Sequence, residues 1–174
     1  NLILDQSSIR RGYGGAVLSG IQTAKYPLIL CVDSDGQCDP SDLPFFLKSF
    51  RKNGISIGWR TTRKDVSQRL IFSKAFKIVF SILFPNNLHD PSAPFVLFGK
   101  KTVNRIIPFL GYLREGFWWG FVGACLKTNT PIAEFPINHR KRLLGETQVY
   151  HPKELPSIAL RNIIGLCFLR FARV

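Results

Sequence analysis

The hydrophobic pattern in the first third of the chain alternates between helix-like periods and strand-like runs. Residues 28–32 form an unbroken apolar run of strand length, which is typical of a strand buried on both faces of a parallel sheet. Apolar positions at helical spacing predict a helix over residues 12–25 and another over residues 41–52, the second with Ser41 as its N-cap. A short strand follows at residues 55–58. This order predicts an α/β fold with a mostly parallel sheet flanked by helices.

The later part of the chain predicts longer helices and one more strand. Residues 66–84 and 155–174 each combine apolar positions with Lys or Arg, a pattern typical of helices that lie in a membrane interface. Packing against the sheet explains the first of these segments equally well, so the second is the better membrane candidate. Residues 102–110 predict a further helix, residues 132–137 a strand and residues 139–150 a basic loop.

Charge adds a constraint on the partner, because 24 Lys and Arg stand against 11 Asp and Glu, a formal net charge of +13. Such an excess predicts a polyanion: nucleic acid, anionic lipid or a phosphorylated substrate. Residues 60–77 hold six positive side chains and one negative, and residues 139–174 hold seven and two. The aromatic residues fall in apolar runs instead of between basic residues, which favours phosphate at a membrane surface over nucleic acid.

Some protein classes are disfavoured by what the chain lacks. Its longest uncharged apolar stretches, residues 78–88 and 116–126, are too short to span a bilayer, and no signal-peptide pattern is present. The cysteines form no CxxC pair, which argues against zinc. Cys31 and Cys125 lie in apolar runs typical of buried thiols, which favours a reduced compartment. We therefore expect a peripheral protein on the cytoplasmic face of a membrane. Because the chain starts with Asn1 and contains no Met, we interpret it as a piece of a longer protein.

The strongest chemical signal is Asp33-Ser34-Asp35, directly after the apolar strand. Ligands of open α/β sheets bind at the carboxyl ends of the strands. Two carboxylates there can hold Mg²⁺ or Mn²⁺, which share oxygen ligands with substrate phosphates. The alternative is an Asp-rich turn that only caps the next helix. Gly36-Gln37 and the prolines that follow make the combination more specific than a bare DxD.

The glycine cluster Gly12–Gly15 matches neither common nucleotide-binding motif. Val17 occupies the last glycine position of GxGxxG, and no GKS or GKT follows. We interpret these glycines as a tight entry to the helix.

Six segments in a recognisable order cover nearly the whole chain: RGYGGAVLSGI, VDSDGQCDPSDLP, ISIGWRTTR, RLIFSKAF, HDPSAPFVLF and AEFPINHRKRLLGETQVY. They resemble landmarks of family 2 glycosyltransferases, specifically the dolichyl-phosphate mannose synthase-like branch of polyprenyl-phosphate glycosyltransferases. The resemblance implies a GT-A-like fold. It also implies metal-dependent transfer of a sugar from a nucleotide-diphosphate donor to a polyprenyl (dolichyl-type) phosphate.

The resemblance also assigns residues. It implies Asp33 and Asp35 as metal ligands, with Asp35 the more direct ligand and a catalytic residue, and Asp90 as a base or orienting group. For Asp90 a helix-ending Asp-Pro turn is the alternative. The donor-binding residues it implies are Gly14, Asp33, Gln37, Arg140 and Arg142. The residues it implies for the acceptor phosphate are Arg60, Arg69 and Ser73, where planar guanidinium groups suit phosphate oxygens.

The chain also departs from the family pattern. Pro94-Phe95-Val96-Leu97 stands where the family usually has G-F-R-L, and Gly120 follows an aromatic pair where related sequences often carry an acid. The family begins with a strand–helix–strand unit that binds the donor's base and ribose, and this sequence starts at what resembles the strand after that unit. We therefore expect residues 1–154 to form a partial GT-A catalytic domain that binds sugar nucleotide poorly, followed by an interfacial helix over residues 155–174.

Three other readings stay open on the sequence. One is a sugar-phosphate nucleotidyltransferase-like enzyme, whose Gly-rich, Lys-containing signature is missing here. Another is a non-catalytic basic module that binds anionic lipid or nucleic acid. The last is a degenerate relative, against which the intact Asp33, Asp35 and Arg140 argue.

Overall fold

The computed structural model describes residues 3–61, 67–113, 115–140 and 154–173, with only the backbone for residues 67–70. Four strands form one sheet in the order β1-β3-β2-β4. They are β1 (Leu28–Cys31), β2 (Ile55–Arg60), β3 (Val96–Gly99) and β4 (Ile132–Ile137).

The sheet is mixed, which corrects the expectation of a mostly parallel one. Strands β2 and β4 pair in parallel, but β3 lies between β1 and β2 and runs antiparallel to both. As a result β1, β2 and β4 point the same way, as the strand–helix–strand pattern predicts, and β3 alone is reversed. Neither β3 nor its reversed direction was predicted from the sequence, because its four residues carry no signal of strand direction.

The helices are α1 (Gly12–Thr23), α2 (Leu43–Ser49), α3 (Ser67–Leu83), α4 (Lys100–Ile106), α5 (Phe117–Lys127) and α6 (Leu155–Phe171), with 3₁₀ turns η1 (Pro40–Asp42) and η2 (Ile107–Phe109). All the helices except α5, which was not predicted, lie close to their predicted ranges. The N-cap prediction for Ser41 is wrong. The capping side chain is that of Asp39, which accepts a hydrogen bond from the Ser41 amide at 3.0 Å. The basic loop predicted over residues 139–150 lies almost entirely outside the described residues.

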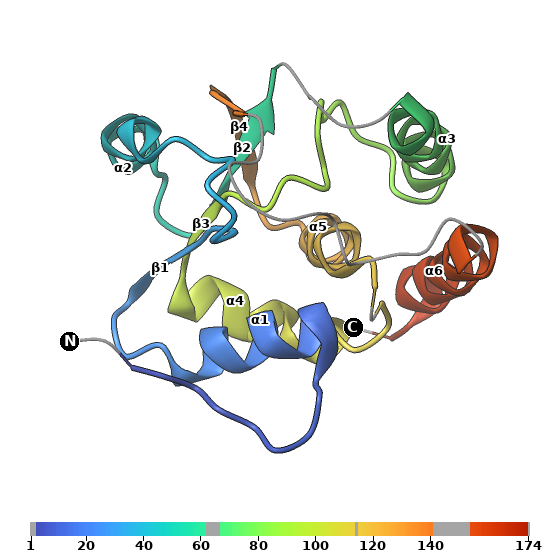
Figure 1. Ribbon diagram of the computed structural model, residues 1–174, viewed down its shortest axis with the longest axis horizontal. Coiled ribbons are helices and arrows are strands. Elements are labelled where there is room, and N and C mark those ends of the chain that lie inside the picture. The colour runs from blue at the N-terminus through green and yellow to red at the C-terminus, as the bar shows by residue number, and fades with distance from the viewer. Residues whose placement is uncertain (1–2, 62–66, 114, 141–153, 174) are drawn as a thin grey trace.

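The sheet separates two apolar cores. On one face α2 packs through Phe46 against Phe95, Leu97 and Ile137. On the other face α1, α4 and α5 cover the sheet, and the larger core includes Val96 and Phe98 (Figure 1). Residues 96–98 thus alternate between the two cores, as expected of a strand that is buried on both faces.

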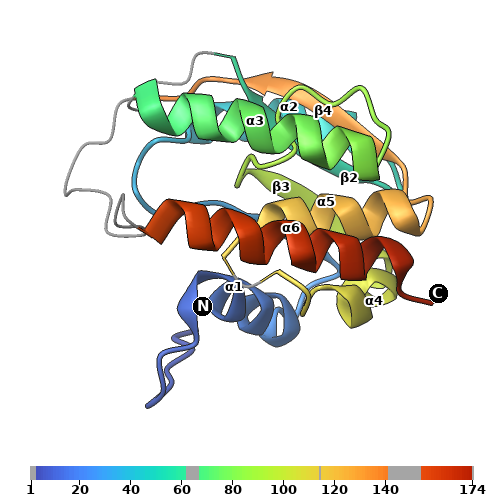
Figure 2. The same cartoon turned by 90° about the vertical axis from the view of Figure 1, so that its right-hand side faces the viewer.

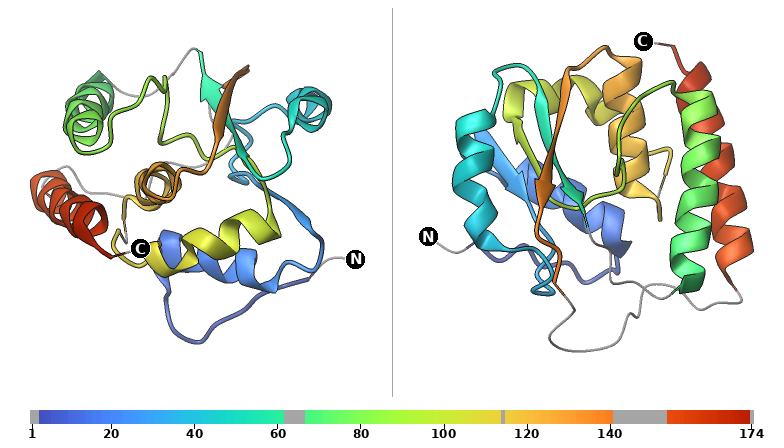
Figure 3. Two further views of the ribbon diagram at one scale, coloured as in Figure 1. Left: turned by 180° about the vertical axis from the view of Figure 1, so that it is seen from behind. Right: turned by 90° about the horizontal axis from the view of Figure 1, so that it is seen from above.

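Helices α3 and α6 form an outer layer beyond α5, where they lie side by side (Figures 2 and 3). Phe80 of α3, Phe84 just after that helix, and Leu166 and Leu169 of α6 are buried in the larger core. Gly165 lets α6 approach closely, because a Cβ at this position would lie 2.3 Å from the Tyr112 carbonyl oxygen. Among the described helices, none is long and apolar enough to cross a membrane.

Candidate functional site

The ends of three strands converge on one cleft of about 410 Å³. Asp33 and Asp35 follow β1, Arg60 ends β2 and His139 follows β4, and all four side chains line the cleft. These strands point the same way, so their carboxyl ends meet at one sheet edge, where ligands of α/β proteins bind. His139 is buried in the wall of this cleft.

The opposite part of the cleft is apolar. Side chains from α3, α5 and α6 line it: Phe72, Phe76, Val79, Trp119, Leu155, Ile158 and Ile163. Phe76 packs edge-on against Trp119, with 5.0 Å between the ring centroids. The cleft therefore runs from an acidic end beside the sheet to an apolar end between the two outer helices.

Asp33 is oriented by a chain of hydrogen bonds that starts on α5. The Tyr13 hydroxyl donates to Asp33 Oδ1 at 2.8 Å and accepts from Trp118 Nε1 at 2.7 Å. Burial, followed by the nearby Asp33 charge, raises the pKa of Tyr13 well above its usual range, so the hydroxyl stays protonated as a donor. Sequence reasoning missed Tyr13, because its partner on α5 is 105 residues away.

Asp35 sits in the turn that follows. Its Oδ1 accepts a hydrogen bond from the Gln37 amide at 3.1 Å, and Gly36 between them has a φ of +75°, which glycine adopts without strain. Gln37 is joined to Arg140 by two hydrogen bonds, one from the Arg140 amide to the Gln37 carbonyl at 2.8 Å. The Arg140 guanidinium forms an ion pair with Asp39. Asp35 and Gln37 line the cleft, whereas Arg140 does not.

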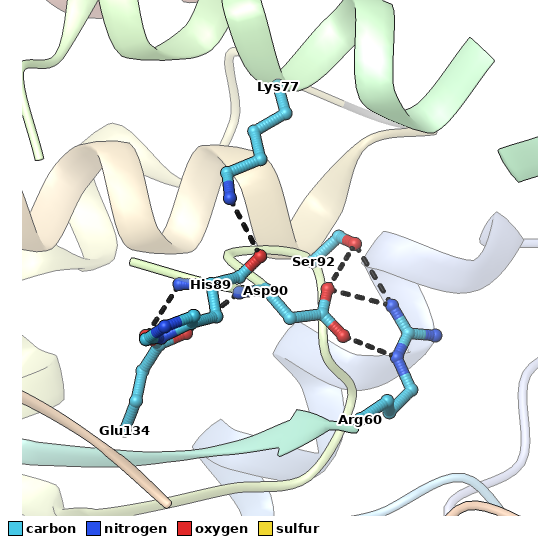
Figure 4. A network of polar contacts seen from close by, with 6 residues as sticks. All are labelled: Arg60, Lys77, His89, Asp90, Ser92 and Glu134. Carbon is cyan, nitrogen blue, oxygen red and sulfur yellow. Dashed lines mark hydrogen bonds and ion pairs between the residues drawn. The ribbon is translucent and has the colours of Figure 1, made fainter. Parts of the chain in front are cut away.

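Arg60 and Asp90 form a bidentate ion pair. Arg60 Nε lies 2.6 Å from Asp90 Oδ2, and Arg60 Nη2 lies 2.9 Å from Asp90 Oδ1 (Figure 4). Both side chains are nearly buried, with 10% and 7% of their surface exposed. Ser92 completes the group, because its hydroxyl donates to Asp90 Oδ1 at 3.0 Å and accepts from Arg60 Nη2 at 3.1 Å.

A second cleft of about 320 Å³ adjoins the first. Arg60, Ser73 and Trp119 line both, while Asp90, Lys74 and Lys77 line only the second. The predicted acceptor residues Arg60 and Ser73 therefore come together at the boundary between the clefts.

Three other predicted residues are placed less directly. Gly14 is buried in α1 and does not line either cleft. Arg69 lies in α3, but its side chain is outside the described residues, as is the whole of Arg142. Their predicted roles stay predictions.

The acidic end of the cleft offers two carboxylates to a hard divalent cation, so a substrate or water would have to supply the remaining ligands. Within the described ranges, no group of three or more His, Cys, Asp and Glu side chains is close enough to enclose an ion. Two carboxylates from one turn are nevertheless a normal protein contribution to Mg²⁺, which takes its other ligands from water and phosphate oxygens. Asp33 and Asp35 thus fit a metal shared with a diphosphate.

Comparison with known proteins identifies the family. The fold and the cleft define an α/β domain with an acidic ligand site at the carboxyl ends of its strands. Residues 2–118 match the family described as Glycosyl transferase family 2. The chain belongs to glycosyltransferase family 2, which confirms the resemblance seen in the sequence.

Two curated relatives support this result. The chain is 31% identical over 183 residues to a dolichyl-phosphate beta-glucosyltransferase of Dictyostelium discoideum, covering 95% of this chain and 56% of that protein. It is 36% identical over 171 residues to a dodecaprenyl-phosphate galacturonate synthase of Rhizobium johnstonii, covering 94% and 48%. The chain thus spans about half the length of these relatives.

Solved structures agree on the fold. A mycobacterial protein of known crystal structure superposes with a TM-score of 0.63 at 17% identity, over 95% of this chain and 53% of that one. Glucosyl-3-phosphoglycerate synthase from Mycobacterium tuberculosis, solved with UDP, gives a TM-score of 0.61 at 14% identity, over 97% and 58%. The expected GT-A-like α/β fold is confirmed.

Proposed function

We propose that the chain is the part of a glycosyltransferase that moves a sugar from a nucleotide-diphosphate donor to a polyprenyl phosphate. One observation carries the proposal: a single cleft joins two aspartates at the sheet edge to an apolar groove between α3 and α6. A phosphate attached to a long hydrocarbon chain matches both ends of such a cleft. The names of the two curated relatives each contain a polyprenyl phosphate, which supports the same acceptor class.

At the acidic end, we assign Asp33 and Asp35 to a Mg²⁺ or Mn²⁺ ion that the donor diphosphate shares. When bound, such a cation neutralises the charge that develops on the departing nucleoside diphosphate. Tyr13 and the Gln37 amide each fix one of the two carboxylates, so the chain presents them in a defined orientation. We also keep Gly14, Gln37, Arg140 and Arg142 as proposed donor contacts, on the family resemblance.

At the boundary of the two clefts, we assign Arg60 and Ser73, together with Arg69, to the acceptor phosphate. A phosphate monoester is already a strong nucleophile, so this step needs positioning more than a base. A phosphate oxygen forms a bond to the anomeric carbon while the bond from that carbon to the diphosphate breaks, and the nucleoside diphosphate leaves with the electron pair. The ion pair between Asp90 and Arg60 supports an orienting role for Asp90.

We further propose that the outer face of α3 and α6 rests on the cytoplasmic surface of a membrane. Exposed apolar side chains on this face are Ile71, Ile78 and Ile82 of α3 and Leu160, Ile164, Phe168 and Phe171 of α6. Lys74, Arg161 and Arg170 are exposed on the same helices and would meet anionic headgroups. In this orientation the apolar end of the cleft opens toward the lipid phase.

An acceptor series tests the proposed reaction. The natural protein is incubated with labelled nucleotide sugars and one of three acceptors: a polyprenyl phosphate, the matching polyprenol, or a short alkyl phosphate. We expect product only with the polyprenyl phosphate, because it alone supplies both the phosphate and the hydrocarbon chain. Asp35→Asn should lower the rate by about 100-fold or more, whereas Asp5→Asn, which changes an acid outside the cleft, should not. Equal transfer to the polyprenol, or an active Asp35→Asn variant, would reject the proposal.

A further inference from the structure

We propose that Glu134 is a positioning residue that sets the orientation of Arg60 by holding the turn that carries Asp90. The inference rests on the proposed function, because it takes Arg60 as a contact of the acceptor phosphate. Glu134 lies on β4 and was not singled out in the sequence, although a carboxylate in an otherwise apolar strand is a signal that could have found it.

The Glu134 carboxylate holds the backbone of the turn directly. Its Oε1 accepts a hydrogen bond from the Asp90 amide at 2.8 Å, and its Oε2 accepts one from the His89 amide at 2.6 Å (Figure 4). Oε2 also lies 3.0 Å from His89 Nδ1. Only 9% of the Glu134 side chain is exposed, so these charge-assisted hydrogen bonds form in a poorly solvated environment.

The turn then transmits this position to Arg60. Because the Asp90 amide is fixed on Glu134, the Asp90 carboxylate is oriented to form its bidentate ion pair with Arg60. Strands β2 and β4 are parallel neighbours, with Ile57 opposite Glu134 in register. The path from Glu134 through Asp90 to Arg60 therefore starts and ends on adjacent strands of one sheet.

Side-chain contacts, and not regular secondary structure, hold the segment that contains the turn. Residues 85–95 belong to no helix or strand. Besides Glu134, the turn is held by Lys77, whose Nζ donates to the His89 carbonyl at 3.0 Å, and by Trp59, which stacks on the His89 ring with 3.9 Å between centroids. Trp59 and Lys77 both contact His89, whereas Glu134 also accepts a hydrogen bond from the Asp90 amide.

Replacement of Glu134 by Gln is the sharpest test. The amide keeps the size of the side chain but has one carbonyl oxygen for two backbone N–H groups, and its NH₂ group faces a donor. The matched control is Glu154→Gln, an exposed acid at the start of α6 outside this network. The readouts are the exchange rate of the Arg60 Nε proton by NMR and the KM values for donor and acceptor, all measured on the natural protein.

We expect Glu134→Gln to speed exchange of the Arg60 Nε proton and to raise the KM for a short-chain polyprenyl phosphate, each by about tenfold. The donor KM and the melting temperature should stay close to those of the control, which a purely structural role would not produce. Unchanged exchange at Arg60, or a faster exchange with an unchanged acceptor KM, overturns the inference. Failure of the proposed function would be distinguishable, because the unmodified protein would then show no transfer to polyprenyl phosphate. The proton exchange at Arg60 would still decide whether Glu134 sets the orientation of Arg60.

Discussion

The charged residues of the cleft are oriented by side chains that the chemistry itself does not use. Tyr13 and Trp118 fix Asp33, whereas Glu134 fixes the turn of Asp90. In each case the fixing residue comes from a different element than the residue it holds. Neighbours of this kind would hold the proposed catalytic groups in one orientation before substrate binds, which lowers the cost of reaching the reactive geometry.

Tyr13→Phe should weaken the response of the enzyme to metal. Removal of the hydroxyl takes from Asp33 the donor that fixes its Oδ1, and it leaves the buried indole N–H of Trp118 without this acceptor. We expect the Mn²⁺ concentration for half-maximal transfer to rise by about three- to tenfold, with roughly 1 kcal/mol lost from the free energy of unfolding. The measurement is a Mn²⁺ titration of initial rates.

The control for this prediction is Tyr26→Phe, which removes the same hydroxyl from an exposed position distant from the cleft lining. It should leave both the Mn²⁺ titration and the stability unchanged. Identical titration curves for Tyr13→Phe and the unmodified enzyme would show that Asp33 keeps its orientation without the tyrosine.

Part of the site could be predicted at the residue scale and part could not. Asp33, Asp35 and Arg60 follow strands, and the ends of strands that share a direction meet at one edge, so local pattern was enough to bring them together. Tyr13 contacts Trp118, which is 105 residues away, and Glu134 contacts Asp90, which is 44 residues away. No local period encodes such a contact, and the sequence gives it no signal beyond a polar side chain in an apolar context.

At the scale of elements, apolar spacing predicted the helices better than the sheet. A helix repeats its apolar face every three to four residues, so α1 and α3 carry several turns of signal. Strand β3 has four residues and runs antiparallel to its neighbours β1 and β2. Its direction is determined by pairing with both strands, and not by its own residues. The aromatic segment of α5 was not predicted as a helix, because most of its residues are buried and no polar face marks it.

The packing of α6 depends on one glycine. Gly165→Ala should destabilise the fold by about 1–3 kcal/mol, because the added Cβ would lie 2.3 Å from a backbone oxygen of Tyr112 and α6 would have to move. This outcome opposes the intrinsic preference of a helix for Ala over Gly, which is worth about 1 kcal/mol. Urea unfolding followed by circular dichroism measures the difference.

Gly20→Ala in α1 is the matched control, since nothing lies within 4 Å of the Cβ it would add. Here only the helix preference acts, so we expect a gain of up to about 1 kcal/mol. If the two variants shift the unfolding midpoint in the same direction, the close approach of α6 to Tyr112 does not limit the packing.

At the scale of the whole molecule, basic residues and exposed apolar side chains occur together on the outer helices. The net charge of +13 belongs to a chain whose outer layer, α3 and α6, exposes apolar side chains beside Lys and Arg. The opposite helix α2 also exposes apolar groups, Phe45 and Leu47, but it lies on the other side of the sheet from α3, α5 and α6 (Figure 1). An interfacial face needs both features together, because apolar area supplies the attachment and basic residues supply the preference for anionic lipid.

The double substitution Phe168→Ser with Phe171→Ser should lower binding to anionic vesicles by about tenfold or more, because each exposed phenyl ring contributes roughly 1–2 kcal/mol when it enters the interface. Co-sedimentation with vesicles that contain phosphatidylserine measures the binding, and 0.5 M salt should weaken what remains, since the basic residues still act. Phe45→Ser on α2 is the control and should bind as the unmodified protein does. Equal losses of vesicle binding from both variants would place the membrane contact elsewhere. The apolar end of the cleft would then open to water, and a polyprenyl chain would have no favourable path from the membrane to the cleft.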